Sequence, residues 1–185
     1  QSIDGVASFD GVDDGVRFAP FTIGGNDDIT MTWWQKVNHG ARATHANYGG
    51  VGTNVFRFGA TSVDGRVGVT WFADDPTKWF FYINPIGTSA WPAEDFASTT
   101  VIPVDNSKWS FIAWRIRAAD GLWSITVDDQ EVFSDIRQKM PVKTYDDVSA
   151  AHSIGGDGNM LGLVEDWRMY RKFLTNNEVA AVRKG

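Results

Sequence analysis

The chain has 185 residues, a formal net charge of −6, nine tryptophans and no cysteine. This length suits one domain with a full hydrophobic core, so we expect residues 1–185 to form a single domain that needs no disulfide. The acidic balance argues against nucleic acid as a partner, because phosphate binding needs clustered Lys and Arg. No apolar run approaches the roughly 18 to 20 residues of a membrane span, so we expect no membrane insertion.

Short segments rich in Val, Thr, Trp and Phe follow one another along the chain, separated by turns of Gly, Asp and Asn. This pattern is typical of an all-β sandwich or jelly roll rather than of βαβ units. A capping box, Thr175 with Glu178 three residues on, predicts one short helix near the C-terminus. The expected strands are Val6–Asp10, Val16–Pro20, Asp28–Val37, Asn54–Thr61, Arg66–Phe72, Trp79–Ile83, Ser98–Val104, Trp109–Arg117, Leu122–Val127, Glu131–Ser134, Ser153–Ile154 and Leu161–Tyr170.

Two motifs at the ends of the chain carry a family resemblance. The segment Gly162 to Val182 (GLVEDWRMYRKFLTNNEVAAV) joins a strand to the capped helix, and Ala7 to Asp14 reads ASFDGVDD. Together they resemble the closing and opening segments of bacterial and phage laminin-G-like domains, members of the concanavalin A-like superfamily. The resemblance implies a two-sheet antiparallel jelly-roll sandwich in which the first and last strands are neighbours. In the hairpin after Leu122–Val127, Asp129 replaces the turn glycine that is usual in the family, so we expect that turn to differ.

Catalytic signatures known from this superfamily are missing. The chain has four Glu, at positions 94, 131, 165 and 178, and none belongs to the E-x-D-x-x-E array that gives a retaining glycosidase its paired carboxylates. It has no lyase-type R-x-E-x-R strand and no G-x-S-x-G elbow. The three His, at 39, 45 and 152, have no zinc-site spacing. We therefore expect no intrinsic enzymatic activity.

The aromatic residues give the clearest binding signal. Trp33 and Trp34 are adjacent on one expected strand, so they must face opposite sides of it; we expect Trp33 in the core and Trp34 packed on the second face. The segment from Trp71 to Tyr82 has aromatic residues on both faces of two expected strands, with an acidic turn between them. Because one face is enough to form the core, the other is free to hold rings for a ligand.

Sugar recognition needs such rings beside carboxylates and amides, because the apolar face of a pyranose stacks on a ring while its hydroxyls donate to oxygen acceptors. We expect a glycan or cell-surface polysaccharide to contact this loop region. The alternative is that Trp79 belongs to the core and that Trp91 fixes a long loop onto the sandwich. The predicted contact residues are Tyr48, Trp71, Asp74, Asp75, Trp79, Tyr82 and Trp91.

A group of acidic residues predicts one structural Ca²⁺. Glu165 shares strand phase with Leu163 and Trp167, which places its carboxylate on the side that reads as buried. The family resemblance implies that this position lies close to the opening turn, where Asp10, Asp13 and Asp14 offer the hard oxygen ligands that calcium prefers. The alternative is that Glu165 accepts backbone N–H groups and that the Asp residues shape a turn.

Three functions remain open at this stage. The first is a non-catalytic carbohydrate-binding or adhesion module of a secreted or surface protein, hence extracellular. The second is a phage decoration or tail attachment protein, with virion proteins as partners. The third is a structural spacer beside other domains of a glycan-degrading enzyme. Because the chain starts at Gln1 without a Met, we expect a processed or excised piece of a longer protein.

Overall fold

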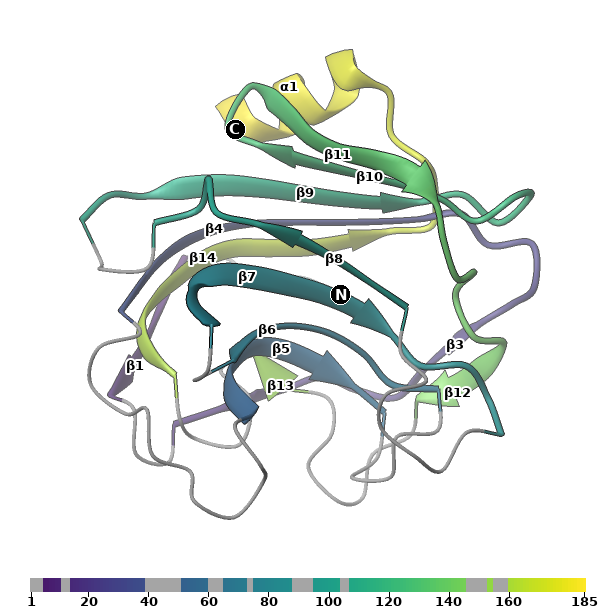
Figure 1. Cartoon of the computed structure of the whole chain (residues 1–185), viewed down its shortest axis with the longest axis horizontal. Coiled ribbons are helices and arrows are strands. Elements are labelled where there is room, and N and C mark those ends of the chain that lie inside the picture. The colour runs from purple at the N-terminus through teal and green to yellow at the C-terminus, as the bar shows by residue number, and fades with distance from the viewer. Residues whose placement is uncertain are drawn as a thin grey trace.

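The structure, a computed structural model, describes residues 5–10, 14–38, 51–59, 65–72, 75–87, 95–103, 107–145, 153–154 and 160–185, with only the backbone described at 38, 51–53, 71–72, 75–76, 95–96 and 153–154. Two six-stranded sheets face each other, and every pairing between described strands is antiparallel (Figure 1). The predicted two-sheet antiparallel jelly-roll sandwich is confirmed.

The first sheet has the order β1 (Val6–Asp10), β14 (Leu161–Tyr170), β4 (Ile29–Asn38), β9 (Ser110–Ile116), β10 (Leu122–Val127) and β11 (Gln130–Ile136). The second has the order β2 (Val16–Arg17), β13 (Ser153–Ile154), β5 (Val51–Phe58), β6 (Val67–Phe72), β7 (Asp75–Ile83) and β8 (Asp95–Thr99). A small pair, β3 (Phe21–Ile23) with β12 (Lys143–Tyr145), lies at one end of the sandwich (Figure 1).

The two ends of the chain meet as the terminal motifs predict. β1 pairs with β14, and Phe9 lies opposite Gly162. The helix α1 (Asn176–Lys184) begins after Thr175, whose side chain accepts from the backbone N–H of Glu178 while Glu178 accepts from that of Thr175. The capping box is therefore formed. No helix within the described residues combines the length and apolar character needed to cross a membrane.

Aromatic side chains fill the space between the sheets. Trp33, Trp79, Trp114, Trp123 and Trp167 are all fully buried in one cluster. Trp114 and Trp123 make an edge-to-face contact in which the ring centroids are 5.0 Å apart. Trp34 faces the other way, onto the outer side of the first sheet, where it packs 5.3 Å from Phe111. The opposite placement of Trp33 and Trp34 follows from strand alternation, as predicted.

α1 covers the outer side of the first sheet (Figure 1), and a buried cation helps to hold the segment that leads into it. Arg115 on β9 is 3% exposed and donates to the carbonyl of Leu174 at 3.1 Å and to Oδ1 of Asn176 at 2.6 Å. It also pairs with Glu131 on β11 at 3.2 Å. Desolvation by burial lowers the pKa of Arg115, and the negative charge of Glu131 opposes that shift.

A β-bulge in β14 overturns the predicted side for Glu165. The register with β4 shifts between Glu165 and Arg168, and Asp166 has a φ of 52°, so one extra residue enters the strand. Val164 and Trp167 consequently both point into the core, while Glu165 lies opposite Trp34 on the outer side. The simple alternation that grouped Glu165 with Trp167 was wrong for this reason.

Some strand bounds also differ from the prediction. β3 and β12 were not predicted, because three residues are too few to display an alternating pattern. The strand expected at Ser98–Val104 ends at Thr99, whose hydroxyl accepts from the N–H of Val101 at 3.1 Å and turns the chain out of the sheet.

Candidate functional site

β7 has two rows of side chains, and the structure decides which of them faces outward. Trp79, Phe81 and Ile83 are fully buried in the core between the sheets. Lys78 and Phe80, on the alternate row, are partly exposed on the outer face of the second sheet. The stacking role predicted for Trp79 is therefore wrong, because its indole lies inside the sandwich and presents no surface to a ligand.

Polar groups surround the outward row of β7. Phe80 lies opposite Thr70 of β6 on one side and opposite the exposed Ser98 of β8 on the other. Tyr82 follows on the same row, 4% exposed, and its hydroxyl donates to Oδ1 of Asn54 at 3.4 Å. Tyr82 thus belongs to the predicted face, but as a buried, hydrogen-bonded residue rather than as an open stacking surface.

A glycine makes room for Tyr82. Gly68 is its partner across β6, and a Cβ added there would lie 2.6 Å from the Tyr82 hydroxyl oxygen. The absence of a side chain at Gly68 therefore allows the phenol to lie across the neighbouring strand. Arg57 is the partner of Gly68 on β5 and is 7% exposed. The outer face of this sheet thus combines rings, an amide and a guanidinium.

The structure describes the remaining predicted glycan contacts only in part. Trp71 and Asp75 belong to β6 and β7 as far as the backbone is described. Phe72 pairs with Asp75, which brings the two strands together at the expected acidic turn. Tyr48, Asp74 and Trp91 lie outside the described residues. The role of these five residues stays a prediction.

The predicted calcium ligands do not converge on one point. Asp10 lies opposite Leu161, whereas Glu165 lies opposite Val6, four residues away and about 13 Å along the strands. Asp14 uses its carboxylate to accept the backbone N–H of Asp10 at 2.9 Å. Asp13 is outside the described residues, and among those described no group of three or more His, Asp or Glu side chains is arranged to hold a metal. The predicted set, as far as the structure describes it, does not fit a single calcium ion.

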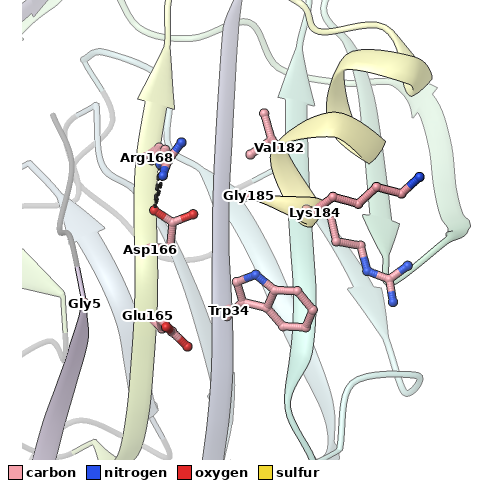
Figure 2. Close-up of a pocket in the computed structure, with 9 residues that line it drawn as sticks. Gly5, Trp34, Glu165, Asp166, Arg168, Val182, Lys184 and Gly185 are labelled. Carbon is pink, nitrogen blue, oxygen red and sulfur yellow. Dashed lines mark hydrogen bonds and ion pairs between the residues drawn. The ribbon is translucent and has the colours of Figure 1, made fainter.

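Glu165 instead borders an open hollow on the outer side of the first sheet, about 340 Å³ in volume (Figure 2). One wall is β14, with Glu165, Asp166 and Arg168; the other is the end of α1, with Val182 and Lys184. Trp34 projects from β4 between the two walls, as Figure 2 shows. The hollow thus combines an indole with carboxylates and cations.

Most charges around the hollow are already paired. Asp166 accepts from Nε of Arg168 at 2.7 Å and forms an ion pair with the same guanidinium. Arg183 lies 5.8 Å over the ring of Trp34 and forms ion pairs with Asp129 and, at 3.8 Å, with Asp128. Its hydrogen bond to Asp129 holds the pKa of that carboxyl below its usual value. Glu165 has no hydrogen-bond or ion-pair partner among the described residues.

Sequence reasoning missed Phe80 and the hollow. For Phe80 the signal was the alternation along β7, which separated two rows but did not say which was outward. For the hollow the signal was Asp129, which replaces the glycine usual at this turn. The preceding Asp128 has a φ of 55°, and Asp129 forms an ion pair with Arg183, the residue that lies over Trp34 in the hollow.

The structure describes three of the four Glu side chains, and each of the three has a different role or position. Glu131 holds Arg115, Glu178 caps α1 and Glu165 faces the hollow. They lie on β11, α1 and β14, so they do not form the single-strand array of a retaining glycosidase.

Comparison with known proteins supports the fold. No protein-family model matches the chain, and no curated protein matches it in sequence. Among solved structures, it is similar to the binding domain of botulinum neurotoxin serotype G (TM-score 0.59, 10% identity, 98% of this chain and 45% of that one). The chain thus spans less than half of that neurotoxin domain.

Two further structures match over more of their own length. Domain 4 of AbnA, an extracellular arabinanase from Geobacillus stearothermophilus solved in complex with arabinotriose, has a TM-score of 0.58 and 17% identity over 98% of this chain and 79% of that one. The CBM40 of the Ruminococcus gnavus IT-sialidase has a TM-score of 0.56 and 10% identity over 91% of this chain and 96% of that one. At these identities the likeness concerns the fold, a lectin-like β-sandwich.

Proposed function

We propose that this chain is a non-catalytic carbohydrate-binding module, and that its glycan contacts the outer face of the second sheet at Phe80. The observation that carries the proposal is the outward row of β7: the partly exposed ring of Phe80 lies between the buried Thr70 and the exposed Ser98, on the side of the second sheet that faces away from the core cluster. A ring flanked by hydrogen-bonding groups is the arrangement that sugars require.

The chemistry of each group follows from its position. The ring of Phe80 stacks on the apolar face of a sugar, while the Ser98 hydroxyl and the Lys78 ammonium bond to its hydroxyl groups. The other predicted contacts, Tyr48, Trp71, Asp74, Asp75 and Trp91, are proposed to take part in the same binding. Stacking on one ring is worth about 0.5 to 1.5 kcal/mol beyond the burial of its area, by analogy with aromatic pairs, so a single site is weak and several copies are needed for avidity.

The structural neighbours support this class of function. The arabinanase domain was solved with arabinotriose bound, and the sialidase domain is named as a carbohydrate-binding module. Both belong to larger glycan-degrading enzymes, so we assign this chain to a secreted or surface protein of several domains. On the strength of its two end motifs we further assign it to the laminin-G-like type.

Glycan-array screening of the purified chain, followed by titration of any positive glycan against the Phe80→Ala variant, tests the proposal. We expect binding that weakens in the variant while the thermal midpoint stays close to that of the parent. Ile136→Ala, at an exposed residue of β11 in the first sheet, is a control that should change neither quantity. If no glycan binds, the chain is not a carbohydrate-binding module and the structural spacer is the better interpretation.

A further inference from the structure

We propose that the hollow between β14 and α1 is a second saccharide-binding site, which takes a single sugar ring at a glycan end or side branch. The hollow lies on the outer side of the first sheet (Figure 2), whereas Phe80 lies on the outer face of the second sheet. The inference rests on the proposed function, because it assumes that the module's ligands are glycans. It concerns a different surface with different residues.

The volume of the hollow suits one sugar unit. Its volume of about 340 Å³ falls at the lower end of the range for small-molecule sites. Such a volume leaves little room for a second ring within the walls. An end or branch residue that enters from solvent therefore suits the hollow better than the middle of a polysaccharide chain.

The aromatic group in the hollow is held in place before any ligand arrives. Trp34 packs 5.3 Å from Phe111 beneath α1, and Arg183 lies 5.8 Å over its ring. Arg183 is in turn fixed by Asp129 of the β10–β11 turn, so residues from three parts of the chain position the indole. Because the ring is already ordered, binding loses little entropy in immobilising it.

The polar groups are of the kind that bind hydroxyls. Asp166 and Arg168 satisfy each other, which leaves Glu165 as the carboxylate without a partner among the described residues. Lys184 is exposed on the wall opposite Glu165. A sugar between them meets an acceptor on one side and a donor on the other, beside the indole of Trp34, over which Arg183 already lies.

Two sites on opposite faces give the module a property that neither site has alone. A glycan chain on the second sheet and a glycan end in the hollow occupy different sides of the sandwich. One copy of the chain can therefore bridge two saccharides that lie on different sides of it.

The test uses the full chain labelled with ¹⁵N, whose tryptophan indole N–H signals are assigned by replacing single tryptophans with Phe. Cellotriose, arabinotriose and sialyllactose are the probes. We expect at least one probe to shift the indole signal of Trp34 in a saturable way. Glu165→Gln should weaken that binding on the order of tenfold, because a hydrogen bond to a charged acceptor becomes a weaker one to a neutral amide oxygen. Lys184→Ala should weaken it by less.

Asp135→Asn is the matched control, since it makes the same carboxylate-to-amide change on β11, at the opposite edge of the sheet, and should leave the affinity unchanged. The second site is refuted if no probe shifts Trp34 at millimolar concentration, or if Glu165→Gln binds as tightly as the parent. A probe whose binding is sensitive to Phe80→Ala but leaves Trp34 unmoved refutes the second site and keeps the proposed function. Probes that affect neither region refute the second site, and the glycan array then decides the proposed function by itself.

Discussion

Two adjacent residues of β7 should respond in opposite ways to the same substitution. Trp79 is fully buried in the core, whereas Phe80 is partly exposed on the outer face. Trp79→Ala removes an indole from a packed interior and leaves a cavity, which typically costs about 3 to 5 kcal/mol of unfolding free energy. Phe80→Ala removes a ring that is only partly buried, so we expect a loss of about 1 kcal/mol.

The two changes should be easy to separate by experiment. For a domain of this size each kcal/mol lowers the thermal midpoint by about 2 to 4 °C, so Trp79→Ala should lower it by roughly 6 to 20 °C. Urea unfolding, followed by circular dichroism, should give the same order with similar slopes. In glycan titrations Phe80→Ala should bind about two- to tenfold more weakly, as expected for the loss of one stacking contact.

A result with the roles exchanged would refute the reasoning. If Trp79→Ala kept the parent's stability and lost glycan binding, the indole would face a ligand and the assignment of the two rows would be wrong. If Phe80→Ala cost as much stability as Trp79→Ala, the outer ring would be structural, and the proposed glycan face would lose its main support.

Three further predictions concern stability. Arg115→Met should lower the unfolding free energy by about 2 to 3 kcal/mol in urea titrations, because it leaves the buried carbonyl of Leu174 and the amide oxygen of Asn176 without their donor; stability equal to the parent's would contradict this. Gly121→Ala should destabilise the protein far more than Gly87→Ala, although both glycines have a similar φ, 80° and 85°. A Cβ added at Gly121 would lie 2.2 Å from the carbonyl oxygen of Arg137, whereas a Cβ added at Gly87 would meet nothing within 4 Å. Equal losses would show that backbone strain alone decides. Acid should destabilise the protein between about pH 5 and pH 2. The pKa of Glu178 is lowered to about 2, mainly by its hydrogen bond with Lys172. The pKa of Asp120 is also lowered to about 2, mainly by its hydrogen bond with Arg117. Both pKa values are lower than in the unfolded chain, so these carboxylates stabilise the fold above their unfolded-state pKa values, and this stabilisation is lost as the pH falls. The urea midpoints of Glu178→Gln and Asp120→Asn should therefore depend less steeply on pH than the midpoint of the parent.

The sequence by itself determined the fold class of this protein and the position of its helix. Alternating apolar residues and closely spaced turns are local properties, and they predicted an antiparallel sandwich. The capping box of Thr175 and Glu178 is also local, so the helix was found at the right place. Trp33 and Trp34 were assigned correctly to opposite faces because strand alternation fixes the relative sides of neighbours.

Only the tertiary structure decided which surfaces are available to a ligand. Trp79 and Phe80 are both aromatic, so the alternating pattern separated two rows of β7 without showing which row meets the other sheet. For Glu165 a single extra residue in β14 reversed the side of the carboxylate, and nothing in the local pattern announces such a bulge. The contact of Asp129 with Arg183 joins a hairpin turn to the last helix. Contacts of this kind depend on how distant elements pack, and for that reason the hollow beside Trp34 was not visible in the sequence.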